Sequence, residues 1–281
     1  MSLFLLQLRG ELTKLFARKR TYIGFGVFLA VEIALVLLLG MPAVQRSLER
    51  IITRSGYAAE EYLSGLTLAL MVLVWSVFLL GSLYLALVSG DLVAKEAEDG
   101  TLRMLLCRPV SRARLLLLKA IACLVYTVVL VLFIGITALL AGFAYGGTGG
   151  LFVFIPVERM FALYDFNSGL IRYAWAIPLL ALSLSTISFL GLFFSCLDIK
   201  PAAATILTLS IFLVDTILKN IPYFEDIRGW FLTDKMNAWM SVFEYRIPWE
   251  SMVISYTWLM AINATLLVLA WIIIERRDFK S

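Results

Sequence analysis

The stretch TYIGFGVFLAVEIALVLLLGM, from Thr21 to Met41, decides the fold. Its only charged residue is Glu32. A helix needs about 20 apolar residues to cross the hydrocarbon core of a bilayer, so this stretch predicts a transmembrane helix.

Apolar runs of similar length recur along the chain. Hydrophobic residues make up 62% of the 281 residues and charged residues 16%, whereas soluble domains are roughly 45–50% apolar and about 25% charged. We therefore expect an all-α integral membrane protein with one transmembrane domain over residues 1–281. The six expected spans are residues 21–41, 63–89, 115–145, 173–196, 201–221 and 253–274.

The first 20 residues predict a helix of a different kind. Apolar side chains recur at steps of three and four residues, which is typical of an amphipathic helix lying in the headgroup layer. These positions are Leu5, Leu8, Leu12, Leu15 and Phe16. The alternative is that residues 1–20 only begin the first span.

The positions of Lys and Arg predict the orientation. With six spans both termini lie on one side, and that side holds most of the 24 basic residues, with Arg18-Lys19-Arg20 and Arg276-Arg277 next to spans. Because basic residues gather on the cytoplasmic side, we expect both termini in the cytoplasm, at the inner membrane of a prokaryote.

The most charged part of the chain, residues 91–119, lies between the second and third spans on the predicted cytoplasmic side. Gly100 is suited to end the helix that leaves the second span, Pro109 prevents a short following helix from continuing, and Ser111 is suited to cap the next helix. The segment is longer and more structured than a simple connection needs, which favours a docking surface.

This segment carries a family resemblance. It resembles the signature of type-2 ABC exporter permeases, and the chain also has the family's amphipathic start with Glu11 and Lys14 and its Arg276-Arg277-Asp278 tail. Ile273 and Ile274 stand where a phenylalanine is usual before that tail, so the tail matches less well. The matching positions of the segment are Glu96, Glu98, Gly100, Thr101, Leu102, Pro109, Ser111, Arg112 and Lys119.

The resemblance implies a permease subunit with a cytoplasmic coupling helix that docks on an ATPase. It implies as partners two ABC ATPase subunits and a second permease copy or paralogue, besides membrane lipid, and no nucleic acid. The sequence contains no Gly-x-x-x-x-Gly-Lys-Ser/Thr loop, so we expect no enzyme activity and no cofactor in this chain, with ATP and Mg bound by the partner. The residues expected to couple to the ATPase are Glu96, Glu98, Gly100, Thr101, Leu102, Arg103, Arg108, Pro109, Ser111 and Arg112.

Two acidic residues fall inside expected spans. Glu32 lies ~17 Å into the first span, where an acid is costly and must face protein. It is either a substrate, ion or proton site or a protonated hydrogen-bonding group. Asp215 has Lys219 one helical turn away, which favours a structural ion pair. The chain has no histidine and its three cysteines lack ligand spacing, so no metal site is expected.

Other functions stay open beside export of an unidentified substrate. A mechanical transmitter would move an extracytoplasmic accessory protein or a membrane partner. In the outer segment before the last span, one apolar face is formed by Met236, Trp239, Met240 and Phe243. The resemblance implies that this segment forms a gate or contacts a partner; the alternative is an amphipathic helix resting on lipid. A membrane-embedded enzyme is disfavoured, because Glu32 and Asp215 are expected at different depths.

Overall fold

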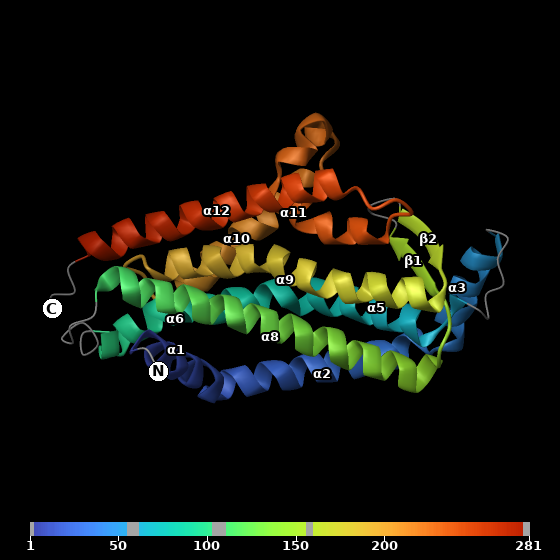
Figure 1. Cartoon of the computed structure of the whole chain (residues 1–281), viewed down its shortest axis with the longest axis horizontal. Coiled ribbons are helices and arrows are strands. Elements are labelled where there is room, and N and C mark those ends of the chain that lie inside the picture. Colours follow the sequence, from blue (N-terminus) through green and yellow to red (C-terminus); the bar gives the residue numbers. More distant parts are fainter. Residues whose placement is uncertain (1–2, 55–61, 103–110, 156–159, 278–281) are drawn as a thin grey trace.

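The computed structural model describes residues 3–54, 62–102, 111–155 and 160–277. Most of them are helical, and the long helices run along one axis (Figure 1). Helices satisfy their own backbone hydrogen bonds, which is what an apolar chain requires in lipid. Five helices are long and apolar enough to cross a membrane: α2 (Lys19–Leu39), α8 (Arg112–Gly146), α9 (Phe166–Ser195), α10 (Pro201–Lys219) and α12 (Trp249–Arg276).

The expected second span is helical but not a regular α-helix. It consists of α5 (Gly65–Ser76), a π-helical turn η1 (Val77–Gly81) and α6 (Ser82–Glu98), which follow one another without a gap. A π-helical turn inside a helix is an insertion that often marks a functional position. Since α5 alone is too short to span, the count of six spans stays a prediction.

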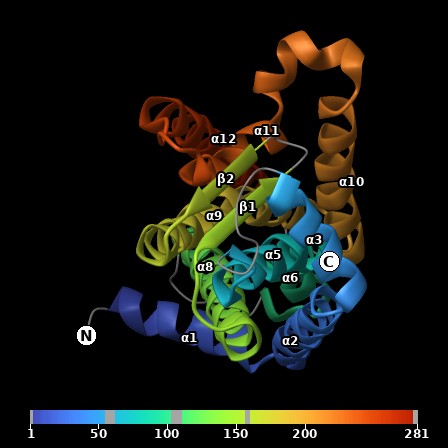
Figure 2. The same ribbon diagram turned by 90° about the vertical axis from the view of Figure 1, so that its right-hand side faces the viewer.

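Two further helices flank α2. These are α1 (Leu3–Ala17) and α3 (Pro42–Arg54). The extended backbone of Arg18 separates α1 from α2, and the Thr21 hydroxyl donates to the Leu15 carbonyl at 2.7 Å across this corner. Seen down the long axis, α1 extends sideways from the bundle (Figure 2). The expected separate N-terminal helix is thus present, and its place in the headgroup layer stays a prediction.

The chain is predominantly helical, as expected for an all-α membrane protein, and it contains one short β-hairpin that was not predicted. Strands β1 (Leu151–Ile155) and β2 (Met160–Tyr164) form an antiparallel hairpin in which Leu151 pairs with Tyr164. The amide of Phe152 donates to the Thr67 hydroxyl at 2.8 Å, so the hairpin is fixed to the start of α5. It lies at the end of the bundle opposite both termini, which we call the hairpin end (Figure 1).

The segment between α10 and α12 is folded in short turns. It comprises η3 (Pro222–Trp230), α11 (Leu232–Met236) and η4 (Asn237–Phe243). The apolar face expected there exists, but Met236, Trp239 and Phe243 are buried in the core of this same chain. That face is therefore occupied and is not free for a partner.

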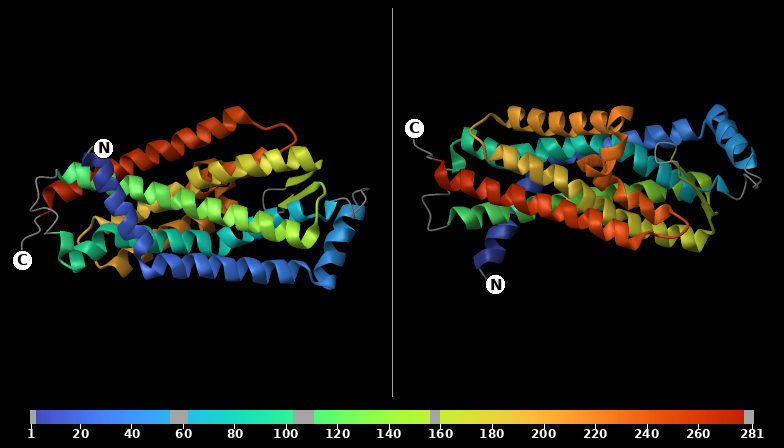
Figure 3. Two further views of the ribbon diagram at one scale, coloured as in Figure 1. Left: turned by 60° about the horizontal axis from the view of Figure 1, so that its bottom comes forward. Right: turned by 90° about the horizontal axis from the view of Figure 1, so that it is seen from above.

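Helix α9 forms the centre of the bundle and packs against α6, α8, α10 and α12. Both views of Figure 3 show it surrounded by other helices. Beside it α5 and α8 approach closely, because Gly65 faces Gly142 and a Cβ on either glycine would collide with the backbone of the other. Side chains of α2, α10 and α12 remain largely uncovered, which suits helices that face lipid or another subunit.

Candidate functional site: the basic end of the bundle

The end of the bundle that holds both termini, here called the basic end, is where the expected coupling residues gather (Figure 1). Helix α6 stops there at Glu98, and the amide of Asp99 donates to the Lys95 carbonyl at 2.9 Å. Gly100 follows with φ +72°, a conformation that glycine adopts without strain. The predicted helix end is confirmed.

Thr101 and Leu102 resume the helical backbone directly after this break. The Thr101 hydroxyl donates to the Glu96 carbonyl at 3.2 Å, across the break. Leu102 is only 2% exposed and belongs to the main core. The first residues of the expected coupling segment are thus fixed to the end of α6.

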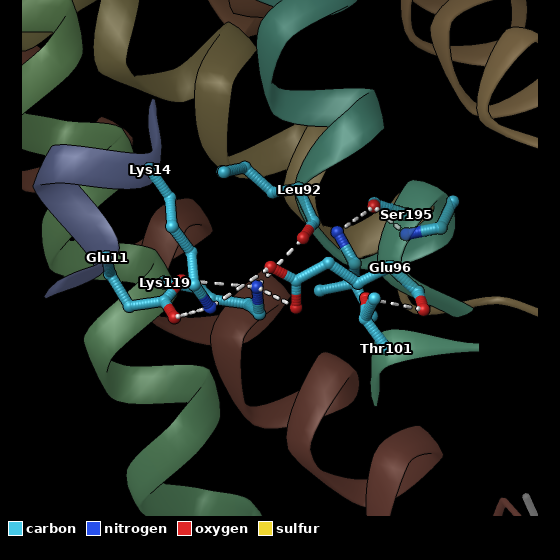
Figure 4. Close-up of polar contacts among 9 residues, drawn as sticks. Glu11, Lys14, Leu92, Glu96, Thr101, Lys119 and Ser195 are labelled. Atoms are coloured by element: carbon cyan, nitrogen blue, oxygen red, sulfur yellow. Dashed lines mark hydrogen bonds and ion pairs between the residues drawn. The ribbon is translucent and has the colours of Figure 1, made fainter. Parts of the chain in front are cut away.

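Lys119 of α8 is the most deeply buried charge at this end, with 1% of its surface exposed. Its ammonium donates to Glu96 Oε2 at 2.7 Å, to the Leu92 carbonyl at 2.9 Å and to Glu11 Oε2 at 3.4 Å (Figure 4). All three ammonium protons therefore have acceptors. One side chain of α8 thereby holds both α1 and α6.

Lys14 completes a charge cluster of Glu11, Lys14, Glu96 and Lys119. Its ammonium lies 2.9 Å from Glu11 Oε1 and 3.9 Å from Glu96 Oε1. Burial raises the pKa of Glu11, but the ammonium groups of Lys119 and Lys14 outweigh burial and hold that pKa below its ordinary value of 4.5. At neutral pH the carboxyl group of Glu11 is therefore ionised, and its attraction to the two ammonium groups stabilises the junction of α1, α6 and α8.

Ser195 links the same turn of α6 to the end of α9. Its hydroxyl oxygen accepts from the amides of Val93 and Ala94, both at 2.8 Å (Figure 4). Displacing this turn of α6 would therefore pull on the central helix as well.

The start of α8 is fixed in two ways. Ser111 accepts a hydrogen bond from the Arg114 amide at 3.3 Å, so the predicted N-cap is confirmed. Arg112 donates to the carbonyls of Ile274, Glu275 and Arg277 at 2.8–2.9 Å. Because these carbonyls end α12 and lack helical partners, Arg112 joins α8 to α12.

Two more basic residues at this end bind other helices, a role that the sequence analysis did not assign to them. Arg277 donates to the carbonyls of Cys196 and Leu197 and forms an ion pair with Asp198, which fixes the turn between α9 and α10. Arg20 forms an ion pair with Asp91 of α6. The sequence did contain a signal for the second pair. Asp91 lies just after the expected span 63–89, on the same predicted side of the membrane as Arg18-Lys19-Arg20.

The expected coupling residues thus meet at one end as far as the structure describes them. Glu98 lies on the surface, where Lys95 binds it at 2.9 Å. Arg103, Arg108 and Pro109 lie outside the described residues. No group of three or more His, Cys, Asp or Glu side chains that could hold a metal occurs in the described ranges.

The two intramembrane acids have different surroundings. Glu32 is 1% exposed, and neither carboxylate oxygen has a hydrogen-bond partner among the residues that the structure describes. Asp215 accepts from the amides of Leu232 and Thr233 at 3.1 and 2.7 Å, at the start of α11. This contact gives Asp215 a structural role through partners that the sequence did not predict. Lys219 binds Asp234 of α11 at 3.3 Å.

Comparisons with known proteins give one family match and one partial relative. A family model described as "ABC-2 family transporter protein" matches residues 7–221. A stretch of 72 residues is 35% identical to the uncharacterized protein YhcI of Bacillus subtilis and covers 26% of this chain. The match spans about a quarter (23%) of the length of YhcI.

Proposed function

The chain belongs to the ABC-2 transporter family, and from this premise we propose that it couples ATP hydrolysis by two separate ATPase subunits to the export of a substrate. Family membership and the apolar helices make it a multi-pass membrane protein and a permease subunit that works with an ABC ATPase. The substrate, the direction of transport and the remaining partners belong to the proposal.

The observation that carries the coupling role is the charge cluster directly beside the break at Gly100. A force applied to the segment after Gly100 reaches Glu96 through Thr101 and Leu102. From Glu96 it passes through Lys119 to α8 and through Glu11 to α1. The buried pair of Lys119 and Glu96 is hydrogen-bonded, and such a contact resists deformation, so these three helices would move together.

The basic residues at this end support a proposal for the location. Helix α8, which carries Arg112 and Lys119, begins at the end that holds both termini (Figure 1), and a basic excess is typical of the cytoplasmic side. We propose that the basic end faces the cytoplasm of a prokaryote and meets the ATPases there. In this proposal ATP and Mg are held by the ATPases.

The position of η3 supports pairing with a second permease, either a copy or a paralogue. This turn lies near the middle of the long axis and projects sideways from the bundle (Figure 1). It exposes Glu225 and Asp226 together with the large side chains of Tyr223 and Trp230, and a mixed polar and aromatic surface is typical of a protein–protein contact. A second permease, or a water-filled cavity shared with it, would shield this face.

Co-purification tests the proposal most directly. The tagged chain is extracted from its native membrane in mild detergent, and bound proteins are identified by mass spectrometry. A stoichiometric ABC ATPase whose activity rises with a transported solute supports export. An ATPase together with a stable extracytoplasmic protein, and no transported solute, favours the mechanical transmitter. Absence of any ATPase, where other ABC transporters stay intact, contradicts the coupling role.

A charge reversal at the surface tests where the ATPase docks. Glu98→Lys changes a side chain that is 46% exposed and pairs only at the surface, so folding should be preserved. We expect this variant to lose most of its bound ATPase. Glu275→Lys, a reversal of another exposed acid at the basic end, should keep it. Equal retention by both variants contradicts docking beside Gly100.

A further inference from the structure

The corner between α1 and α2 contains a groove that the coupling mechanism does not use. The groove has a volume of about 600 Å³, within the range of roughly 300–1,000 Å³ that is usual for ligand sites. Its walls include the apolar side chains of Leu5, Leu8, Leu12, Phe16 and Tyr22, and one cation, Arg9.

The lining of the groove contains one charged residue, Arg9, and no acidic residue. No hydrogen bond or ion pair to another described residue engages the side chain of Arg9, which is exposed. Lys19, at the start of α2 beside the groove, is exposed and equally unengaged within the described ranges. An apolar groove with unpaired cations is complementary to a molecule that has an apolar body and an anionic head.

The position of the groove selects the kind of molecule. Helix α1 extends across the long axis at the point where the membrane-length helix α2 begins (Figure 2), which is the level of lipid headgroups. Basic groups at this level attract anionic lipids. We propose that the groove between α1 and α2 binds an acidic phospholipid, with an acyl chain against Leu8, Leu12 and Phe16 and the phosphate at Arg9.

This site would be linked to the charge cluster. Glu11 lies on α1 between Leu8 and Leu12 but is bound by Lys119 of α8. A lipid seated in the groove would hold α1 in the position at which Glu11 reaches Lys119. The proposal concerns lipid binding by the permease alone, so it stands or fails independently of the ATPase and of the transported substrate.

Native mass spectrometry of the full-length chain, purified in detergent and delipidated, tests the site. The probes are dioleoylphosphatidylglycerol and dioleoylphosphatidylcholine, offered at equal concentration. We expect the wild type to retain the phosphatidylglycerol preferentially and Arg9→Gln to lose roughly fivefold in that retention, the effect of about one basic group at an anionic surface. Lys200→Gln removes an exposed cation of the same end, at the start of α10 on the far side of the bundle from α1 (Figure 2), and should behave as wild type.

Three results would overturn the proposal. They are equal retention of both lipids by the wild type, equal losses in Arg9→Gln and Lys200→Gln, and displacement of the lipid by inorganic phosphate alone, which would indicate an anion site without a role for the acyl chain. Leu12→Asn provides a second variant on the apolar wall. It should weaken retention of the phosphatidylglycerol while the chain stays monodisperse.

Discussion

Lys119 joins three helices through one buried ammonium group, and at the residue scale its removal is the sharpest test of the charge cluster. Lys119→Met leaves the buried carboxylate of Glu96 without its closest partner, and breaking such a pair typically costs roughly 3–5 kcal/mol. We expect a loss of that size in the free energy of unfolding, measured by denaturant titration in detergent. Lys95→Met, which removes an exposed and paired lysine, should cost less than about 1 kcal/mol.

The double variant Lys119→Met/Glu96→Gln separates the pair from the single side chains. Since no unpaired charge then remains at Glu96, the double variant should be more stable than Lys119→Met alone. The single variants Lys119→Met and Glu96→Gln are measured beside it. If the loss of unfolding free energy in the double variant equals the sum of the two single losses, Lys119 and Glu96 do not stabilise each other, and the transmission path proposed through them fails.

Replacing Glu32, unlike Lys119, should not destabilise the protein, because no other described residue forms a hydrogen bond with its carboxyl group. Glu32→Gln keeps the shape of the protonated acid and removes the cost of an ionisable group inside the membrane. We expect the thermal midpoint of the purified chain to stay the same or rise. A clear fall would mean that the carboxyl group makes a stabilising contact, whereas unchanged stability with lost transport would assign it to substrate or proton binding.

The sequence predicted these residues better than their contacts. Glu96, Lys119 and Arg112 stood out by the family motif, and Glu32 by its place in an apolar run. The partners of Arg112 are the last carbonyls of α12, more than 160 positions away in the chain. No local spacing rule reaches that far, because the contact depends on how whole helices pack.

At the scale of elements, the end of α12 depends on a side chain from α8. Arg112→Ala removes donors to three carbonyls that have no helical partner. We expect faster amide hydrogen exchange over residues 270–277 and a loss of roughly 1.5–3 kcal/mol in the unfolding free energy, which is typical for hydrogen bonds to a charged group. Arg276→Ala, which truncates an exposed neighbour in the last turn, should leave the exchange unchanged.

Hydropathy located the long helices well, and each expected span coincides with helical structure except for at most two residues at either end. It missed the β-hairpin, although LFVFI at Leu151–Ile155 is rich in β-formers. The run is too short to span a membrane, and its pairing with Met160–Tyr164 is fixed by Thr67 of a distant helix. It also missed the π-helical turn at Val77–Gly81, which a hydropathy window cannot register.

At the scale of the whole molecule, the two ends of the bundle predict different chemical accessibility. Cysteines are introduced singly at Tyr245, exposed at 86% in the connection from η4 to α12, and at Lys200, exposed at the basic end, after the native cysteines are replaced by alanine. In intact cells a membrane-impermeant maleimide should label Tyr245→Cys and should label Lys200→Cys only after lysis. The reverse pattern would invert the orientation and place the coupling segment outside.

The exposed charged turn η3 predicts how two permeases meet. If the exposed face of η3 is covered by a second copy, exposed side chains of η3 approach their symmetry equivalents. Tyr223, 85% exposed and the second residue of η3, is the position to test. In a chain without native cysteines, Tyr223→Cys should form a disulfide-linked dimer on mild oxidation in the membrane.

Val253→Cys is the matched control for that crosslink. Val253 is 61% exposed on α12, an apolar helix that could face lipid without penalty, so its cysteine should stay monomeric. Equal crosslinking at both positions would indicate random collision. A monomeric Tyr223→Cys in a complex that still contains two copies of this chain would contradict pairing through η3.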